Sequence, residues 1–193
     1  MNKAKHGLKV IGDYFSCWSL RQALTILKSA INATATGVLY KGRSPGELVY
    51  FIDKTKELLG VAFEMLKENS GREKAVLTKE EMVCCLRLSS YHLYCGWHRH
   101  EGPWHFFPRH LSRKEFTDPF HAFCKVTAYQ NRKEWFAILK DLQQYALSAT
   151  AYHSLDPELN LTRISQLLHK LIEAAHLIEV RVVSRKRIRE IWS

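Results

Sequence analysis

Residues 19–31 read SLRQALTILKSAI, and this stretch carries the pattern that decides the fold. Its apolar residues recur every three or four positions, which places them on one face of an α-helix. They are Leu20, Ala23, Leu24, Leu27, Ala30 and Ile31. Ser19 stands directly before them, where a serine can cap a helix. The stretch therefore predicts an amphipathic helix whose apolar face packs into a core.

Similar start signals recur along the chain, each followed by apolar residues at helical spacing. They are the capping boxes Ser44–Glu47 and Thr78–Glu81, the pairs Asp118-Pro119 and Asp156-Pro157, and Asn131 with Glu134. A further helix is expected over Leu8–Trp18, and one unbroken helix over Leu161–Glu179. We predict an all-α fold, an irregular bundle of five to seven helices. Residues 38–40 and 177–183 leave room for one short strand pair, although 177–183 fits a helix continuation too.

The chain of 193 residues is expected to form a single helical domain over 1–193. A long loop is predicted at about 98–117, because Gly102, Pro103 and Pro108 interrupt any helix there. A connection of this length is either functional or contains a short element of its own. It is the candidate internal boundary of the domain.

The net charge is +10 and the isoelectric point is about 9.5. Such a balance favours an anionic partner, with nucleic acid as the first candidate. No apolar run approaches the roughly 20 residues that span a bilayer, so no membrane association is predicted. The five cysteines are odd in number and form no Cys-x-x-Cys pair, which favours buried free thiols and a cytoplasmic location.

Two segments combine features of nucleic-acid contacts. Around the long loop, cations that can bind phosphate alternate with aromatic rings that can stack on bases: Arg99, Arg109, Arg113 and Lys114, with Trp97 and Trp104. The alternative is that the aromatic rings, Phe106 among them, only fix the loop to the core. A second basic cluster that could contact phosphate lies at the C-terminus and consists of Arg181, Arg185, Lys186, Arg187 and Arg189.

The loop also holds the histidines that could bind a metal, which are His98, His100, His105 and His110. Their spacing matches no standard zinc site, so no metal or cofactor is predicted and the four remain candidates only. Glu173 and His176 are one helical turn apart, as in di-iron bundles. That fold needs a second such motif, which is missing, so the two are interpreted as a core or surface pair.

Arg-x(4–6)-His pairs occur at Arg87/His92, Arg99/His105 and Arg163/His169. This spacing resembles the catalytic motif of HEPN-type ribonucleases, which are small helical bundles as well. The resemblance covers only these pairs. Arg87 and His92 fit it best, because both fall within a predicted helix. The resemblance implies that Arg87 stabilises a phosphate and that His92 acts in acid–base catalysis.

Three hypotheses about function remain. The preferred one is a non-enzymatic helical domain that binds an anionic partner, either nucleic acid or a regulatory protein complex, because other catalytic motifs are absent. The second is a HEPN-like, metal-independent ribonuclease that uses Arg87 and His92. The third is a structural or homo-oligomeric protein-interaction module.

Overall fold

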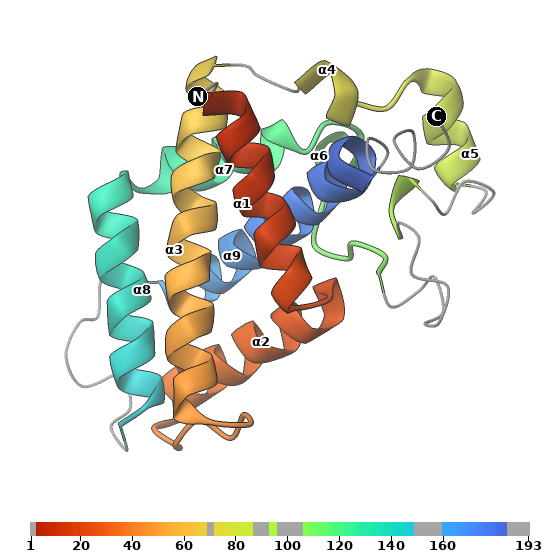
Figure 1. The fold of residues 1–193 in the computed structure, drawn as a ribbon. Helices are drawn as coiled ribbons and strands as arrows, with labels where there is room; N and C mark the ends of the chain where they lie inside the picture. The colour runs from red at the N-terminus through yellow and green to blue at the C-terminus, as the bar shows by residue number, and fades with distance from the viewer. Residues whose placement is uncertain (1–2, 69–71, 87–92, 96–105, 149–159, 185–193) are drawn as a thin grey trace.

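The structure, a computed structural model, describes residues 3–68, 72–86, 93–95, 106–148 and 160–184. Within these ranges every regular element is helical, which confirms the all-α prediction (Figure 1). The elements are α1 (Lys3–Cys17), α2 (Leu20–Thr36), α3 (Pro45–Glu68), α4 (Arg72–Ala75), α5 (Lys79–Leu86), α6 (Arg113–Thr117), α7 (Phe120–Tyr129), α8 (Arg132–Ala146), α9 (Leu161–Ile178) and the π-helix η4 (Glu179–Ser184).

The caps predicted at Ser19 and Asn131 start their helices in the structure. The Ser19 hydroxyl accepts a hydrogen bond from the Gln22 amide at 3.3 Å, and the Gln22 side chain accepts one from the Ser19 amide at 2.8 Å. Gly37 ends α2 with φ 65°, a left-handed conformation that costs glycine little because it has no Cβ. Asn131 caps α8 in the same reciprocal way with Glu134. The helix boundaries thus follow from local hydrogen bonding.

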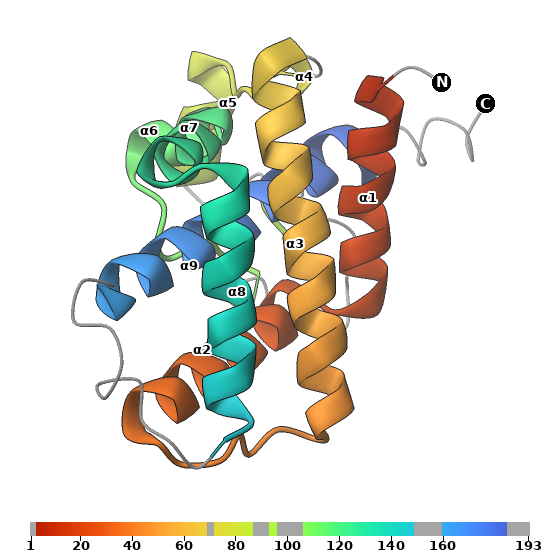
Figure 2. The ribbon, with the colours of Figure 1, turned by 90° about the vertical axis from the view of Figure 1, so that its left-hand side faces the viewer.

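Helix α9 is the centre of the bundle. Figures 1 and 2 show α1, α3 and α8 upright and next to one another, while α2 crosses below them and α7 lies near their upper end. Helix α9 runs on the inner side of this layer and packs against α1, α2, α6 and α7. Every residue from Leu171 to Ile178 is buried, so this half of α9 is covered on all sides. A helix enclosed in this way is a core helix rather than an amphipathic surface helix.

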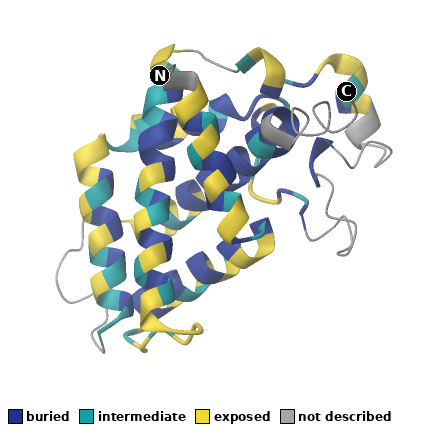
Figure 3. Cartoon of the chain, viewed as in Figure 1, coloured by how far each residue is buried: buried dark blue, intermediate teal, exposed yellow. Residues whose placement is uncertain are grey.

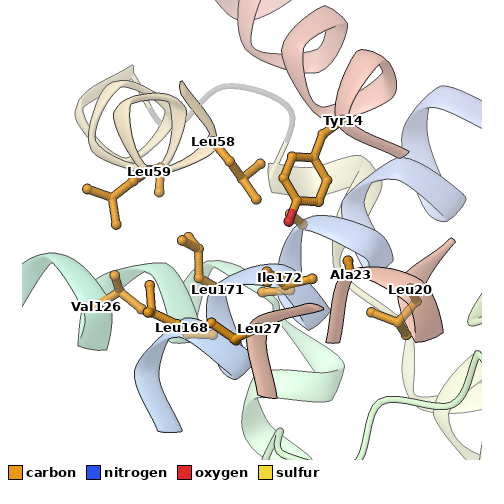
Figure 4. Packing of buried hydrophobic residues seen from close by; sticks show 14 of the residues in the cluster. Tyr14, Leu20, Ala23, Leu27, Leu58, Leu59, Val126, Leu168, Leu171 and Ile172 are labelled. Carbon is orange, nitrogen blue, oxygen red and sulfur yellow. The ribbon is translucent and has the colours of Figure 1, made fainter. Parts of the chain in front are cut away.

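The core forms where the apolar faces of four helices meet α9. Figure 4 shows Leu27 of α2 and Leu58 of α3 approaching Leu168 and Ile172 of α9, and all four are at most 1% exposed. Truncating a leucine in such a site to alanine costs about 2–5 kcal/mol. The outer helices alternate between buried and exposed positions, as Figure 3 shows. The apolar stripe read from residues 19–31 therefore faces this core, with the exception of the half-buried Leu24.

The strand alternative for 177–183 is wrong. Residues 177–178 complete α9, and 179–183 belong to η4. Helix η4 packs against α1 and α4. Val180 and Val182 are buried there. Residues 38–40 form no strand either, and no strand occurs in the described ranges.

Several short elements differ from the sequence prediction. Residues 98–117 were expected to form a loop, but the last five of them form helix α6. This helix begins there because Ser112 and Glu115 form a capping box. Helix α4 was not expected. Helix α5 is described to Leu86, whereas the sequence predicts a helix from the capping box at Thr78 to about residue 94 or 97. Residues 87–92 lie outside the described residues. The start signal at Asp156-Pro157 lies outside them too, and α9 begins after the cap Asn160.

Candidate functional site

A shallow hollow lies where α6 meets α7. Its volume is about 460 Å³, and it is lined by Arg113, Lys114, Thr117, Asp118 and His121. The capping box at Ser112 starts α6, and its five residues place Arg113 and Lys114 on the exposed side while Glu115 and Phe116 face inward. Two cations predicted as nucleic-acid contacts thus line one hollow.

The acidic side chains of this region are buried, and they form hydrogen bonds and ion pairs within the protein. Glu115 is 1% exposed, and its carboxylate accepts hydrogen bonds from Lys170 at 2.6 Å and from the Ser112 amide at 2.6 Å. Lys125 also donates to it at 2.8 Å. Burial by itself would raise the pKa of Glu115, but the bonds from Lys125, Lys170 and Ser112 lower it to about 2. The carboxylate therefore stays ionised and neutralised inside the fold.

Asp118 is neutralised in a similar way. It is 8% exposed, and it accepts two hydrogen bonds from the Arg72 guanidinium, at 2.9 and 2.5 Å. Its other oxygen accepts the Phe120 amide at 3.1 Å, at the start of α7. His121 lies at the rim of the hollow, with Nε2 3.6 Å from the same carboxylate. The negative charge of Asp118 is thus largely offset by Arg72.

The cations of this region, in contrast, point to the solvent. Arg109, Arg113, Lys114 and Lys125 are exposed, and among them only Lys125 forms an ion pair within the described ranges. Residues 109–125 hold these four cations and the two acids Glu115 and Asp118, which gives a formal net charge of +2. We call the exposed Arg109, Arg113, Lys114 and Lys125, together with the partly exposed His121, the basic surface.

Glu173 holds the loop before α6 on α9. Its carboxylate is completely buried, and it accepts the amides of Arg109 at 2.9 Å and His110 at 2.8 Å. The His110 Nδ1 atom is 2.7 Å from the same carboxylate. These bonds fix both the backbone and the imidazole ring of His110. Glu173 therefore determines how the first residues of the basic surface are presented.

His169 lies against His110, with ring centroids 4.3 Å apart and planes tilted by 41°. Its Nδ1 atom is 2.7 Å from the Ser165 carbonyl oxygen. Burial is the largest cause that lowers the pKa of His169; His110 and Lys28 lower it too, while the Ser165 bond and Glu173 act in the opposite direction. At neutral pH the ring is therefore uncharged.

Aromatic residues pin the rest of this loop. Phe106 is 2% exposed and stacks on the His176 ring, and Phe107 stacks on Phe116. His176 in turn places Nε2 2.9 Å from the Tyr94 carbonyl oxygen. Glu173 and His176 thus have separate partners and make a core pair, not a metal site. For residues 106–108 the structure supports the interpretation of the aromatic side chains as anchors.

The structure describes only some of the predicted site residues. It places Arg113 and Lys114 at one hollow on α6, and it holds Arg109 and His110, in the loop just before α6, against Glu173 of α9. The remaining candidates lie outside the described residues: Arg87, His92, Trp97, His98, Arg99, His100, Trp104, His105, Arg185, Lys186, Arg187 and Arg189. Their roles stay predictions.

Arg181 corrects the interpretation of the C-terminal cluster. It was grouped with cations that could contact phosphate, yet its side chain is 1% exposed. Its guanidinium donates to the carbonyl oxygens of Leu93 at 3.1 Å, Ala75 at 2.9 Å and Phe116 at 2.9 Å. It also lies over the Phe116 ring, 5.1 Å from the centroid. Arg181 therefore joins three chain segments and is not available to a ligand.

The Arg163/His169 spacing does not produce a joint site. Arg163 is exposed on α9, while His169 faces His110. Within the described residues no hydrogen bond joins the two side chains. Because six residues on a helix correspond to well over one and a half turns, the two side chains leave the helix on different sides.

Sequence reasoning missed Glu115, Glu173 and His169 as parts of this region. The pair Ser112 and Glu115 was a readable capping signal, whereas nothing in the sequence links Glu173 to a loop 63 residues earlier. The burial expected for the cysteines is wrong for Cys17 and Cys124, which are exposed. Cys95 is buried, and burial raises its pKa to about 12.

The described ranges show neither a group of metal ligands nor a membrane-spanning helix. No group of three or more His, Cys, Asp or Glu side chains there could hold a metal ion. No helix among them has both the length and the apolar character that crossing a membrane requires. Comparison with known proteins gave no matching family model, no matching curated protein and no matching solved structure.

Proposed function

We propose that this protein binds an anionic partner, nucleic acid in the first place, through the basic surface on α6 and α7. One observation carries the proposal: the region buries its acids and exposes its cations. Glu115 and Asp118 are 1% and 8% exposed, whereas Arg109, Arg113 and Lys114 are exposed. Cations arranged in this way attract phosphate groups, and release of counterions supplies much of the binding free energy.

The geometry supports positioning as well as attraction. The Glu173 carboxylate holds the Arg109 and His110 amides, and the Glu115 carboxylate ties α6 to α9 through Lys170. The cations therefore stand on a backbone that is fixed at two points. A fixed backbone lowers the entropy lost when a partner binds.

A binding titration tests the proposal. The full chain is titrated into fluorescently labelled single-stranded RNA, and anisotropy is measured between about 50 and 200 mM salt. We expect binding at low salt that weakens as salt rises. The double variant Arg113→Glu with Lys114→Glu should bind at least about tenfold more weakly, with a log–log salt slope reduced by about 1.4 for two lost phosphate contacts.

The matched control reverses two exposed lysines on α8, Lys133→Glu with Lys140→Glu. Both double variants change the net charge equally, and α8 lies on a different side of the bundle from α6 (Figures 1 and 2). If the two variants weaken binding equally, overall charge and not the basic surface is responsible. If the unaltered chain does not bind at low salt, the nucleic-acid proposal is wrong.

A further inference from the structure

His110 and His169 form a pair of imidazoles that the proposed anion binding does not use. They come from the loop before α6 and from α9, 59 residues apart in the sequence. Their ring centroids are 4.3 Å apart. The His110 side chain is 41% exposed, so one edge of the pair is open to solvent. The chemistry of the pair depends on which ring nitrogens carry hydrogen.

The hydrogen-bond partners of both rings determine which nitrogen carries the hydrogen. The His110 Nδ1 atom faces a Glu173 carboxylate oxygen at 2.7 Å, and the His169 Nδ1 atom faces the Ser165 carbonyl oxygen at 2.7 Å. The Glu173 carboxylate already accepts hydrogen bonds from two amides, and the Ser165 carbonyl oxygen carries no hydrogen. Both groups can therefore only accept a hydrogen bond. Each Nδ1 atom must therefore donate. In the neutral rings the lone pair then resides on Nε2 of both histidines.

Neither lone pair is used within the described part of the chain. No hydrogen bond to Nε2 of His110 or His169 occurs there, since every bond of these two rings is made through Nδ1. In each ring Nε2 lies roughly opposite Nδ1, and so points away from Glu173 or from Ser165. Unused nitrogens on two neighbouring imidazole rings are potential ligands for one metal ion.

We propose that His110 and His169 bind one divalent transition-metal ion through their Nε2 atoms. Imidazole is a ligand for zinc, nickel and copper ions. Metal-binding histidines almost always donate their other ring N–H to a carboxylate or a backbone carbonyl oxygen. Glu173 and Ser165 supply one of each. Water completes the coordination of this two-histidine site, in accordance with the absence of a three-residue group in the described ranges.

The ring separation indicates which ions fit. Imidazoles with centroids 4.3 Å apart fit neighbouring ligand positions at a right angle better than the wider angle of a tetrahedron. Right-angled positions occur in the square-planar or tetragonal sites of nickel and copper ions. The buried Glu173 charge favours a cation here, and Lys28 opposes it. We therefore expect Ni²⁺ to bind more tightly than Zn²⁺ relative to their affinities for free imidazole.

Asparagine variants separate the metal site from the structural role of the rings. The Asn amide nitrogen can replace Nδ1, so His110→Asn and His169→Asn keep the bonds to Glu173 and Ser165 while removing Nε2. Glu173→Gln keeps both metal ligands and weakens their orientation, which makes Glu173 a positioning residue. His121→Gln is the control, because His121 is a partly exposed histidine of the same region.

The experiment is a calorimetric titration of the untagged full chain with Ni²⁺ and, separately, Zn²⁺, with circular dichroism to verify the fold of each variant. We expect one ion per chain. Affinity should fall more than about tenfold in each asparagine variant and about tenfold in Glu173→Gln, with His121→Gln unchanged. The absence of binding in the unaltered chain would overturn the proposal. So would binding that survives both asparagine substitutions, because other histidines would then be the ligands.

Discussion

Glu173 and His110 are joined by two hydrogen bonds, one from the His110 amide at 2.8 Å and one from its Nδ1 atom at 2.7 Å. The carboxylate belongs to the most buried half of α9, and the histidine to the loop before α6. A buried acid that accepts this many donors connects a surface segment directly to the core.

Replacement of Glu173 by alanine should destabilise the protein by about 3 kcal/mol or more. The change leaves the amides of Arg109 and His110 without their acceptor in a buried place. Urea unfolding followed by circular dichroism measures the loss. Glu64→Ala, at a partly exposed position of α3, is the comparison and should cost less than about 1 kcal/mol. Equal losses in the two variants would contradict the structural role of Glu173.

Glu115 should make the protein sensitive to strong acid. Its pKa is about 2 in the folded protein and close to 4.5 in the unfolded chain, so the unfolded state takes up a proton first as pH falls. The stabilisation is complete above pH 4.5 and is lost as pH falls toward 2, an effect on the order of 2–3 kcal/mol. Glu115→Gln retains a capping box but loses the carboxylate. The variant should therefore be less stable at pH 7, and its free energy of unfolding should change less between pH 5 and pH 2.

The measurement for Glu115 is urea unfolding at a series of pH values. Glu64→Gln provides the reference, since the Glu64 side chain is partly exposed and its contact with Arg132 is long, at 3.4 Å. The reference variant should follow the pH profile of the unaltered protein. A Glu115→Gln profile parallel to both would show that Glu115 does not carry the acid sensitivity.

Protonation of His169 should destabilise the fold at mildly acidic pH. Its pKa is lowered in the folded protein, so the unfolded chain is protonated first as pH falls through its ordinary value of 6.5. Stability is therefore lost from about pH 6.5 downward until the folded state is protonated as well. His169→Asn should reduce the difference in Tm between pH 7.5 and pH 5.5. An unchanged difference would assign the sensitivity to another group.

Removal of Arg181 should be among the most damaging single changes. Its guanidinium supplies hydrogen bonds to carbonyl oxygens of Ala75, Leu93 and Phe116. Arg181→Met keeps the apolar stem but removes the donors, and we expect a loss of about 3 kcal/mol or more. Arg163→Met, at an exposed position of α9, should change the free energy of unfolding by less than about 0.5 kcal/mol. Chemical denaturation of both variants measures the two changes in the free energy of unfolding, and similar losses in the two would contradict the role of Arg181.

The sequence alone determined the helical class and several helix starts. Ser19 and Asn131 act on backbone groups within a few residues of themselves, so their effect is legible without the fold. The apolar stripe of residues 19–31 likewise needed only the helical period. The same reading failed at 177–183, because β-branched residues suit a strand and a buried helix alike, and only the surrounding helices decide between them.

Tertiary structure decided which charges are available to a partner. Arg113 and Arg181 are the same type of residue, yet Arg113 is exposed beside a hollow and Arg181 is enclosed among carbonyl oxygens. Likewise, only the packing of the loop on α9 brings His110 to His169 and Glu173. These relations join residues about 60 positions apart, and no local pattern encodes them. The sequence set the helices and their apolar faces, and the packing of those faces turned some polar residues into core contacts and left the others on the surface.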